Sequence, residues 1–237
     1  MEFAIIAAGE GSRLAKEGFS KPKPLVKIRG EFMIDRLIRI FSENGATLIR
    51  VIINEESLLL HKHLTESSYQ VPIQIITKTT PSSLHSFYEI IKSKDNQEDI
   101  CLTTTDTVFN PDEFKRFIQA FRENQDADAF MAATSYIDDE SPLYINVDNN
   151  LNILAFEDEG GSPLISGGIY CLRKNALKFG IKATESGMNR MRNFQRGLIE
   201  EGLNVKAYPF EKIVDVDHMS DIATAEFFLE DLTHNIL

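Results

Sequence analysis

Residues 3–28 read FAIIAAGEGSRLAKEGFSKPKPLVKI, an apolar run that passes into a glycine turn and then into spaced cations. The run Phe3–Ala8 has the length and continuity of a strand buried on both faces, which is typical of a parallel sheet with helices on each side. Gly9 and Gly11 permit positive φ angles and a close approach to a ligand, while nearby N–H groups can form an anion-binding concavity. The stretch therefore predicts an α/β fold with a phosphate-binding loop after its first strand.

Two cations follow the glycine turn. Arg13 offers a permanently charged fork for phosphate oxygens, and Lys23 is a compact point charge on a predicted extended segment between Pro22 and Pro24. Together with the glycine loop they indicate a nucleoside triphosphate. The alternative is a tight strand-to-helix turn with a solvated basic loop, which leaves the joint presence of Arg13 and Lys23 unexplained.

Two common nucleotide motifs do not fit this stretch. The dinucleotide fingerprint would need a glycine at Leu14, and the P-loop would need G-K-[S/T] five residues after its first glycine. The pattern G-x-G-[S/T]-R-L, followed by a loop and P-K-P-L-V, instead resembles the signature of the sugar-1-phosphate nucleotidyltransferases. Ser12 replaces the family's usual threonine and retains the hydroxyl. The matching positions are Gly9, Gly11, Ser12, Arg13, Leu14, Pro22, Lys23, Pro24 and Leu25.

The resemblance implies that a sugar-1-phosphate oxygen attacks the α-phosphorus of a nucleoside triphosphate, giving a nucleotide-sugar and pyrophosphate. Arg13 would act at the β- and γ-phosphates, and Lys23 at the α-phosphate and the acceptor phosphate. No general base is expected, because the attacking phosphate is already ionised. The residues expected to bind the nucleotide are Ala7, Ala8, Gly9, Gly11, Ser12, Ser82 and Ser83.

Ser82 and Ser83 lie in a polar turn before an amphipathic helix. Either is a suitable N-cap, and in the resembling family this turn reads the nucleotide base, so the two roles are compatible. The family's usual G-T-A is replaced here by residues without glycine. The sequence therefore does not predict the base.

Two aspartates are expected to hold Mg²⁺, a cation that prefers carboxylate oxygens. Asp106 follows a predicted strand, and open parallel sheets bind ligands at the carboxyl ends of their strands. An aspartate at a strand end is also an ordinary turn residue. In the resembling family an aspartate at this strand end binds the catalytic magnesium, and a late aspartate, matched here by Asp215, is the second protein ligand. Asp217 could point the same way along an extended segment.

The acceptor side is expected in the second half of the chain. Two short apolar runs flank Asn149-Asn150, which is a hairpin signal. The resembling family often has Glu-Lys after a strand, and here Glu157 is retained without the lysine. Gly168 lies in a segment similar to the family's G-x-Y, with a β-bulge or packing glycine as the alternative. Glu157 and Gly168 are the expected acceptor-binding residues.

Alternating strands and amphipathic helices predict a mostly parallel, Rossmann-like (doubly wound) sheet flanked by helices, with an inserted β-hairpin and a C-terminal α/β portion. We expect one domain over residues 1–237, with a nucleotide-binding half at about 1–135 and an acceptor-binding half at about 136–237. The resemblance covers nearly the whole chain, without the β-helix or second catalytic domain of some relatives. It therefore implies a minimal single-domain form.

Charge, hydropathy and cysteine spacing argue against several other classes of protein. The formal net charge of −11 argues against a general nucleic-acid surface. The apolar opening is much shorter than the ~20 residues that span a bilayer. Cys101 and Cys171 lack zinc-site spacing and are expected as buried free thiols of a soluble, cytoplasmic protein. His61 and His63 are expected on the solvated surface, and the oligomeric state is not predicted.

Three other functions compete. A related chemistry is cytidylyl transfer to a non-sugar phosphate such as phosphocholine. A different class is a regulatory domain that binds nucleotides without turnover. A metal-dependent glycosyltransferase would usually show Asp-x-Asp where this chain has Asp106-Thr107-Val108.

Overall fold

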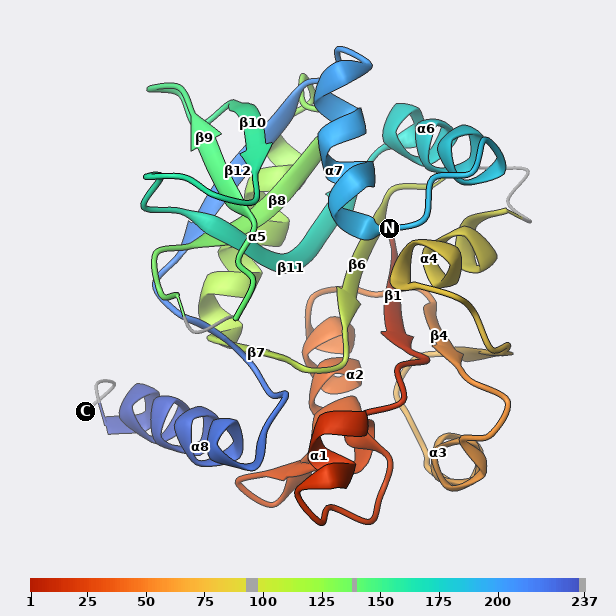
Figure 1. The fold of residues 1–237 in the computed structure, drawn as a ribbon. Helices are drawn as coiled ribbons and strands as arrows, with labels where there is room; N and C mark the ends of the chain where they lie inside the picture. The colour runs from red at the N-terminus through yellow and green to blue at the C-terminus, as the bar shows by residue number, and fades with distance from the viewer. Residues whose placement is uncertain (93–97, 138–139, 235–237) are drawn as a thin grey trace.

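The computed structural model describes residues 1–92, 98–137 and 140–234, which fold around a nine-stranded sheet (Figure 1). The strand predicted at the start of the chain is β1 (Glu2–Ala7), which lies between β4 (Ile49–Ile53) and β6 (Ile100–Thr104) and is parallel to both. β5 (Ile73–Thr77) pairs in parallel with β4. This parallel part of the sheet is the doubly wound arrangement that the sequence predicts.

The second part of the sheet is organised around one long strand, β11 (Ile165–Leu172). It pairs antiparallel with β6 and with β8 (Ala129–Thr134), and β12 (Val205–Phe210) is parallel to β8. The predicted hairpin is confirmed as β9 (Tyr144–Val147) and β10 (Ile153–Glu157). Strands from both halves of the chain thus join one sheet.

Helices cover both faces of the sheet, as the continuous apolar strands require. One face packs against α2, α3 and α5, and the other against α4, α6 and α7. The helices are α1 (Ser12–Lys16), α2 (Met33–Glu43), α3 (Leu58–Glu66), α4 (Ser83–Ile91), α5 (Pro111–Glu123), α6 (Lys174–Glu185), α7 (Met191–Glu200) and α8 (Met219–His234). No helix among the described residues is both long enough and apolar enough to cross a membrane.

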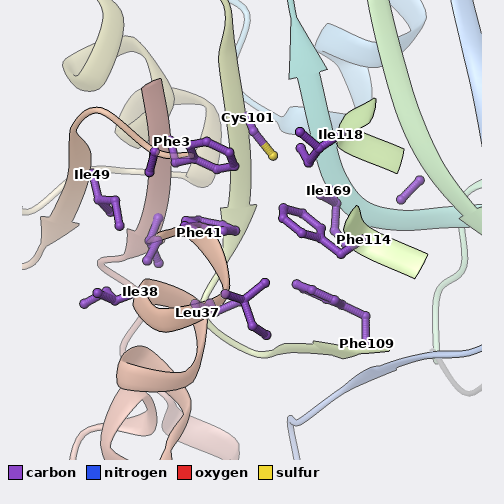
Figure 2. Packing of buried hydrophobic residues seen from close by; sticks show 14 of the residues in the cluster. Phe3, Leu37, Ile38, Phe41, Ile49, Cys101, Phe109, Phe114, Ile118 and Ile169 are labelled. Atoms are coloured by element: carbon purple, nitrogen blue, oxygen red, sulfur yellow. The ribbon is translucent and has the colours of Figure 1, made fainter. Parts of the chain in front are cut away.

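Alternate residues of β1 face two different cores, because successive side chains of a strand point to opposite faces. Phe3 belongs to the first core, where its ring lies 4.7 Å from that of Phe41, which stacks in turn on Phe114 at 5.5 Å (Figure 2). Ala4 belongs to the second core. Burial on both faces is the physical reason for the unbroken apolar run at the start of the chain.

A two-stranded ribbon brings the C-terminal segment to the end of β6. β7 (Thr107–Phe109) pairs antiparallel with β13 (Ile213–Asp215), with Asp215 opposite Thr107. α8 packs on this ribbon and on α1 through a third cluster of buried apolar side chains. A second short pair is formed by β2 (Lys27–Ile28) and β3 (Glu31–Phe32).

Two local expectations are wrong. Lys23 begins a 3₁₀ turn, η1 (Lys23–Leu25), because a proline without an N–H donor is tolerated in the first turn of a helix. His63 is not simply solvated, since its Nε2 lies 2.8 Å from Oδ1 of Asp35. Cys101 and Cys171 are buried free thiols, as predicted, and face each other across β6 and β11.

Candidate nucleotide-binding site

A cavity of about 610 Å³ lies at the carboxyl edge of the parallel strands. Its lining includes Ala8 after β1, Asn54 after β4, Thr79 after β5 and Asp106 after β6. Ligands of open α/β sheets bind at this edge, beyond the strand ends. The chain order of the strands therefore gathers loops that are far apart in sequence around one cavity.

Most of the expected nucleotide-binding residues line this cavity: Ala8, Gly9, Gly11, Ser12, Ser82 and Ser83. Ala7 does not line it. It is the last residue of β1, is 2% exposed and belongs to the first apolar core. Strand alternation turns its side chain toward the helices, so only its backbone could meet a nucleotide, and its expected role stays a prediction.

Gly11 brings the loop against Lys23. Its φ is +60°, a left-handed conformation that L side chains rarely adopt, and an added Cβ would lie 2.9 Å from Cβ of Lys23. The glycine is thus needed both for the turn and for the close approach of the two segments.

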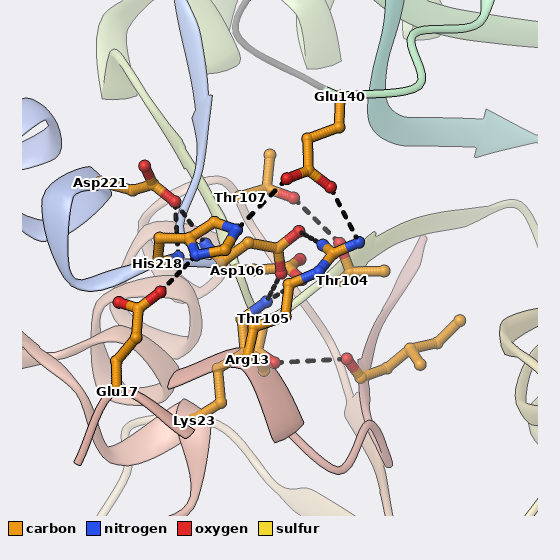
Figure 3. Close-up of polar contacts among 12 residues, drawn as sticks. Arg13, Glu17, Lys23, Thr104, Thr105, Asp106, Thr107, Glu140, His218 and Asp221 are labelled. Carbon is orange, nitrogen blue, oxygen red and sulfur yellow. Dashed lines mark hydrogen bonds and ion pairs between the residues drawn. The ribbon is translucent and has the colours of Figure 1, made fainter. Parts of the chain in front are cut away.

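Asp217 accepts hydrogen bonds from both Lys23 and Arg13, which Figure 3 shows close to Asp106. Lys23 Nζ donates to Asp106 Oδ2 at 2.7 Å and to Asp217 Oδ1 at 2.5 Å. Arg13 Nη1 donates to Asp217 Oδ2 at 2.5 Å. Asp217 therefore links both predicted phosphate-binding cations, and Lys23 joins Asp217 to Asp106.

Burial and charge act in opposite directions on this cluster. Burial disfavours the charge of Lys23, but Asp106 and Asp217 outweigh it and raise the pKa of the lysine. Burial likewise opposes ionisation of Asp106, and the charge and hydrogen bond of Lys23 lower its pKa. The lysine is thus held as a cation and Asp106 as an anion at neutral pH.

One carboxylate oxygen of Asp106 takes no part in these hydrogen bonds. Its Oδ1 is buried and has no hydrogen-bond partner among the described residues. A buried, unpartnered carboxylate oxygen is costly, and a hard cation is a suitable partner for it. The described residues contain no cluster of three or more His, Cys, Asp or Glu side chains suited to a metal ion. A cation here would therefore have at most two acidic side chains of the described residues among its ligands.

Asp215 lines a second, smaller cavity. It does not line the large cavity, whereas Asp217 does. β13 ends at Asp215, so strand alternation does not continue to Asp217, and Asp221 Oδ2 accepts the backbone N–H of Asp217 at 2.9 Å. Asp217 thus lines the large cavity together with Asp106, and the metal role expected for Asp215 stays a prediction.

Three residues of the surrounding network are not predicted by any motif. His218 Nδ1 lies 2.5 Å from Glu17 Oε1, and its Nε2 lies 3.7 Å from Glu140 Oε1. Glu140 also approaches Arg13 at 3.5 Å. The hydrogen bond to Glu17 raises the pKa of His218. These contacts hold the segment between β13 and α8 in place. The sequence does not predict them because the residues that make them are far apart in the chain.

The expected base-reading turn offers hydroxyl groups. Ser82 occupies the N-cap position of α4 without making a side-chain cap bond, and its Oγ lies 2.9 Å from Nδ1 of His85. Thr80 Oγ1 lies 2.6 Å from Ser86 Oγ. Ser82 therefore does not cap α4 through its side chain. It is one of the residues that line the large cavity.

The two expected acceptor residues are placed differently. Gly168 has φ +72° and lies in a bulge of β11, where an added Cβ would be 3.5 Å from Thr107 Oγ1 and 3.9 Å from Thr104 Oγ1. Gly168 therefore forms the bulge and also lies beside the large cavity, because its neighbour Thr104 lines that cavity. Glu157 is exposed at the end of β10 and lines no part of that cavity.

A glycine loop, two cations and an aspartate at the carboxyl edge of a parallel sheet define an α/β protein of the nucleotidyltransferase class. Sequence comparison makes this specific. The MobA-like NTP transferase domain matches residues 3–172, and the chain belongs to this family.

A curated relative is the bifunctional IPC transferase and DIPP synthase of Thermococcus kodakarensis, which is 31% identical over 120 residues. The match covers 48% of this chain and 26% of the relative, so the chain spans about a quarter of that protein.

Three solved structures have the same fold. A putative glucose-1-phosphate thymidylyltransferase from Bacillus anthracis has a TM-score of 0.82 at 17% identity, covering 96% of this chain and 94% of the other. The inositol-1-phosphate CTP transferase from T. maritima has a TM-score of 0.76 at 18% identity, with coverages of 93% and 90%. HddC from Yersinia pseudotuberculosis has a TM-score of 0.74 at 18% identity, with coverages of 96% and 99%.

Proposed function

We propose that this protein is a magnesium-dependent nucleotidyltransferase that joins a nucleoside triphosphate to a sugar-1-phosphate, giving a nucleotide-sugar and pyrophosphate. One observation carries the proposal. Lys23, with its side chain only 10% exposed, lies between Asp106 and Asp217 beside the glycine loop of a nucleotide-sized cavity. A buried cation that is held by two carboxylates has a fixed position, which is what charge stabilisation in phosphoryl chemistry requires.

In the proposed reaction an oxygen of the acceptor phosphate attacks the α-phosphorus. A new P–O bond forms, and the bond to the bridging oxygen of the β-phosphate breaks, so pyrophosphate leaves with the electron pair. Lys23 is proposed to neutralise charge at the α-phosphate and the incoming phosphate. Arg13 and the N–H groups of residues 9–12 are proposed to hold the β- and γ-phosphates.

Magnesium fits the carboxylates of this site. Asp106, whose Oδ1 is buried without a hydrogen-bond partner among the described residues, would hold the ion together with Asp217. Two protein carboxylates, completed by phosphate oxygens and water, are a common way of holding Mg²⁺. When bound, the ion would supply positive charge to the phosphate oxygens.

CTP-dependent transfer to inositol-1-phosphate is a second candidate. It is supported by two similar proteins, one named a bifunctional IPC transferase and DIPP synthase and the other an inositol-1-phosphate CTP transferase. Both candidates share the nucleotidyl transfer and differ in the acceptor and the base.

The deciding experiment combines four nucleoside triphosphates with glucose-1-phosphate, other sugar-1-phosphates, inositol-1-phosphate and phosphocholine. Pyrophosphate release measures turnover, and Lys23→Ala controls for contaminating activity. Turnover with a sugar-1-phosphate supports the first candidate. Turnover with phosphocholine alone contradicts it, and nucleotide binding without pyrophosphate release from any pair favours a regulatory domain.

A further inference from the structure

Two threonine hydroxyl groups form a pair at the wall of the large cavity. Thr104 Oγ1 lies 3.0 Å from Thr107 Oγ1, on either side of the turn that carries Asp106 (Figure 3). Thr104 is the last residue of β6 and lines the cavity, as Asp106 does. Thr107 begins β7, does not line the cavity and is 2% exposed. The pair thus joins a hydroxyl at the cavity to a buried one.

Burial decides which of the two hydroxyl groups donates. Among the described residues, Thr104 is the one side chain that hydrogen-bonds to the hydroxyl of Thr107. A buried O–H group that donates to nothing is costly, whereas Thr104 can give its own proton to whatever occupies the cavity. Thr107 is therefore the donor of this bond and Thr104 the acceptor. The arrangement leaves the proton of Thr104 for a group in the cavity.

The surroundings of Thr104 indicate which kind of group this is. Burial opposes the ionisation of Asp106, but Lys23 and then the nearby hydroxyl of Thr104 lower its pKa. Asp106 Oδ1 nevertheless has no hydrogen-bond partner in the described part of the chain, so it does not take up the proton of Thr104. The proton is therefore available beside Asp106 and Lys23, where the proposed function has the α-phosphate.

A glycine of β11 packs against the pair. Gly168 has φ +72°, and an added Cβ would lie 3.5 Å from Thr107 Oγ1 and 3.9 Å from Thr104 Oγ1. These are ordinary contact distances, so the left-handed backbone and not a lack of space requires the glycine. Because glycine has no polar side chain, this position of β11 offers the two hydroxyl groups no competing hydrogen-bond partner.

We infer that Thr104 donates a hydrogen bond to a nonbridging oxygen of the α-phosphate and that Thr107 is the positioning residue that orients this donor. The inference rests on the proposed function and adds a neutral donor to the cations at the reacting phosphates. Charge in the transition state is spread over the equatorial oxygens of the transferred group, and a fixed donor stabilises it. A hydroxyl that accepts from a second hydroxyl is also a stronger donor itself.

Four variants test the pair. Thr104→Val keeps the shape of the side chain without the hydroxyl, and Thr104→Ser keeps the hydroxyl. Thr107→Val removes the group that orients the donor. Thr184→Val is the matched control, because Thr184 is also a buried threonine but lies on α6 and does not line the large cavity. Thermal unfolding shows which variants are folded, and Thr104→Ala replaces Thr104→Val if the valine prevents folding.

Steady-state kinetics use the substrate pair that releases pyrophosphate. Thr104→Val is expected to lower kcat about ten- to hundred-fold, at or below the usual loss for one oxyanion donor, since Lys23 shares the charge. Thr107→Val should lower kcat about three- to ten-fold, because the donor remains but is no longer oriented. The nucleotide KM should change less than about threefold, as the donor acts mainly in the transition state. Thr104→Ser should recover most of the loss, and Thr184→Val should retain wild-type kcat.

Nucleotides with sulfur on the α-phosphate test the accepting oxygen directly. Each of the two diastereomers replaces one nonbridging oxygen by sulfur, which is a weak hydrogen-bond acceptor. For one diastereomer, wild type should lose more of its rate than Thr104→Val does, because the variant has no hydrogen bond left to lose. For the other, the two enzymes should lose the same fraction. Mn²⁺ binding, followed by electron paramagnetic resonance, should be equal in wild type and Thr104→Val.

Each result decides the inference. Near wild-type kcat in folded Thr104→Val, or equal sulfur effects in both enzymes for both diastereomers, overturns the inference while the proposed function stands. Weaker Mn²⁺ binding by Thr104→Val also overturns it, because Thr104 then acts through Asp106 and not on the phosphate. If wild type releases no pyrophosphate from any substrate pair, the proposed function fails, and this inference fails with it.

Discussion

Lys23 Nζ lies 2.7 Å from Asp106 Oδ2, although the two residues are 83 positions apart in the chain. Lys23 belongs to the loop after α1, and Asp106 follows β6, the strand that pairs directly with β1. The pairing of β1 with β6 places their carboxyl ends side by side, so the contact follows from the strand order. The ion pair joins the segment after the glycine loop to the proposed metal site.

Removal of the cation at Lys23 should reduce turnover more than it reduces stability. We expect Lys23→Ala to lower kcat about 10²–10³-fold, the usual loss when one electrostatic stabiliser is removed. Thermal unfolding in parallel shows how much protein is folded at the assay temperature. Lys21→Ala, two positions earlier and exposed, is the control and should retain activity. A folded Lys23→Ala enzyme with near wild-type kcat would remove Lys23 from the mechanism.

Gly11→Val should abolish nucleotide binding, because the added side chain displaces Lys23. The added side chain must adopt φ +60° and displace Cβ of Lys23, which is 2.9 Å away. Gly18→Val is the matched control, because Gly18 also has a positive φ of +95° but nothing within 4 Å. Both variants should lose about 1–2 kcal/mol of stability from the backbone. In calorimetric titrations with nucleoside triphosphate, Gly18→Val should bind and Gly11→Val should not. Unchanged nucleotide affinity in Gly11→Val would show that the glycine loop is not part of the nucleotide site.

The aspartates should differ in their effect on the metal. Asp106→Asn and Asp217→Asn are expected to raise the Mg²⁺ concentration for half-maximal activity at least about tenfold, since each removes a charged oxygen ligand. Asp215→Asn, outside the large cavity, should have a smaller effect, and Asp148→Asn on the hairpin is the control. Mn²⁺ titration followed by electron paramagnetic resonance measures binding without turnover. Full activity in excess chelator, or normal Mn²⁺ binding by Asp106→Asn, is incompatible with the proposed site.

A pH-dependent contribution to stability is expected from Glu31 and Arg39. Arg39 donates to both oxygens of Glu31 at 2.8 Å, and this hydrogen bonding lowers the pKa of the carboxyl group. A lowered folded-state pKa stabilises the protein above the unfolded value of about 4.3, and the contribution disappears as the pH falls through the folded value. Glu31→Gln should therefore lower the free energy of unfolding by about 0.5–1 kcal/mol at pH 7, because the pair is partly exposed.

Denaturant unfolding at pH 7 and at about pH 3 tests this pair. The difference between wild type and Glu31→Gln should shrink at the acidic pH. Glu43→Gln, which removes the weaker contact to Arg39 at 3.2 Å, should have a smaller effect at pH 7. A Glu31→Gln difference that is the same at both pH values would show that the charge of Glu31 contributes nothing.

The local sequence determines the parts of this protein that depend on neighbouring residues. The apolar run before Gly9 specifies a buried strand, and the spacing of Gly11, Arg13 and Lys23 specifies the loop and its cations. Asn149-Asn150 specifies the hairpin. Each of these features spans a few residues, so backbone preference and burial suffice to predict it.

Only the tertiary structure decides which distant side chains meet. Asp217 rather than Asp215 contacts Arg13, 204 positions away, because β13 ends at Asp215 and Asp221 holds the backbone of the next turn. The amide of Gln195 reaches Ser166 because α7 packs on the sheet beside β11. Side-chain direction past a strand end, and the pairing of a buried polar group, depend on packing between elements that the local pattern does not contain.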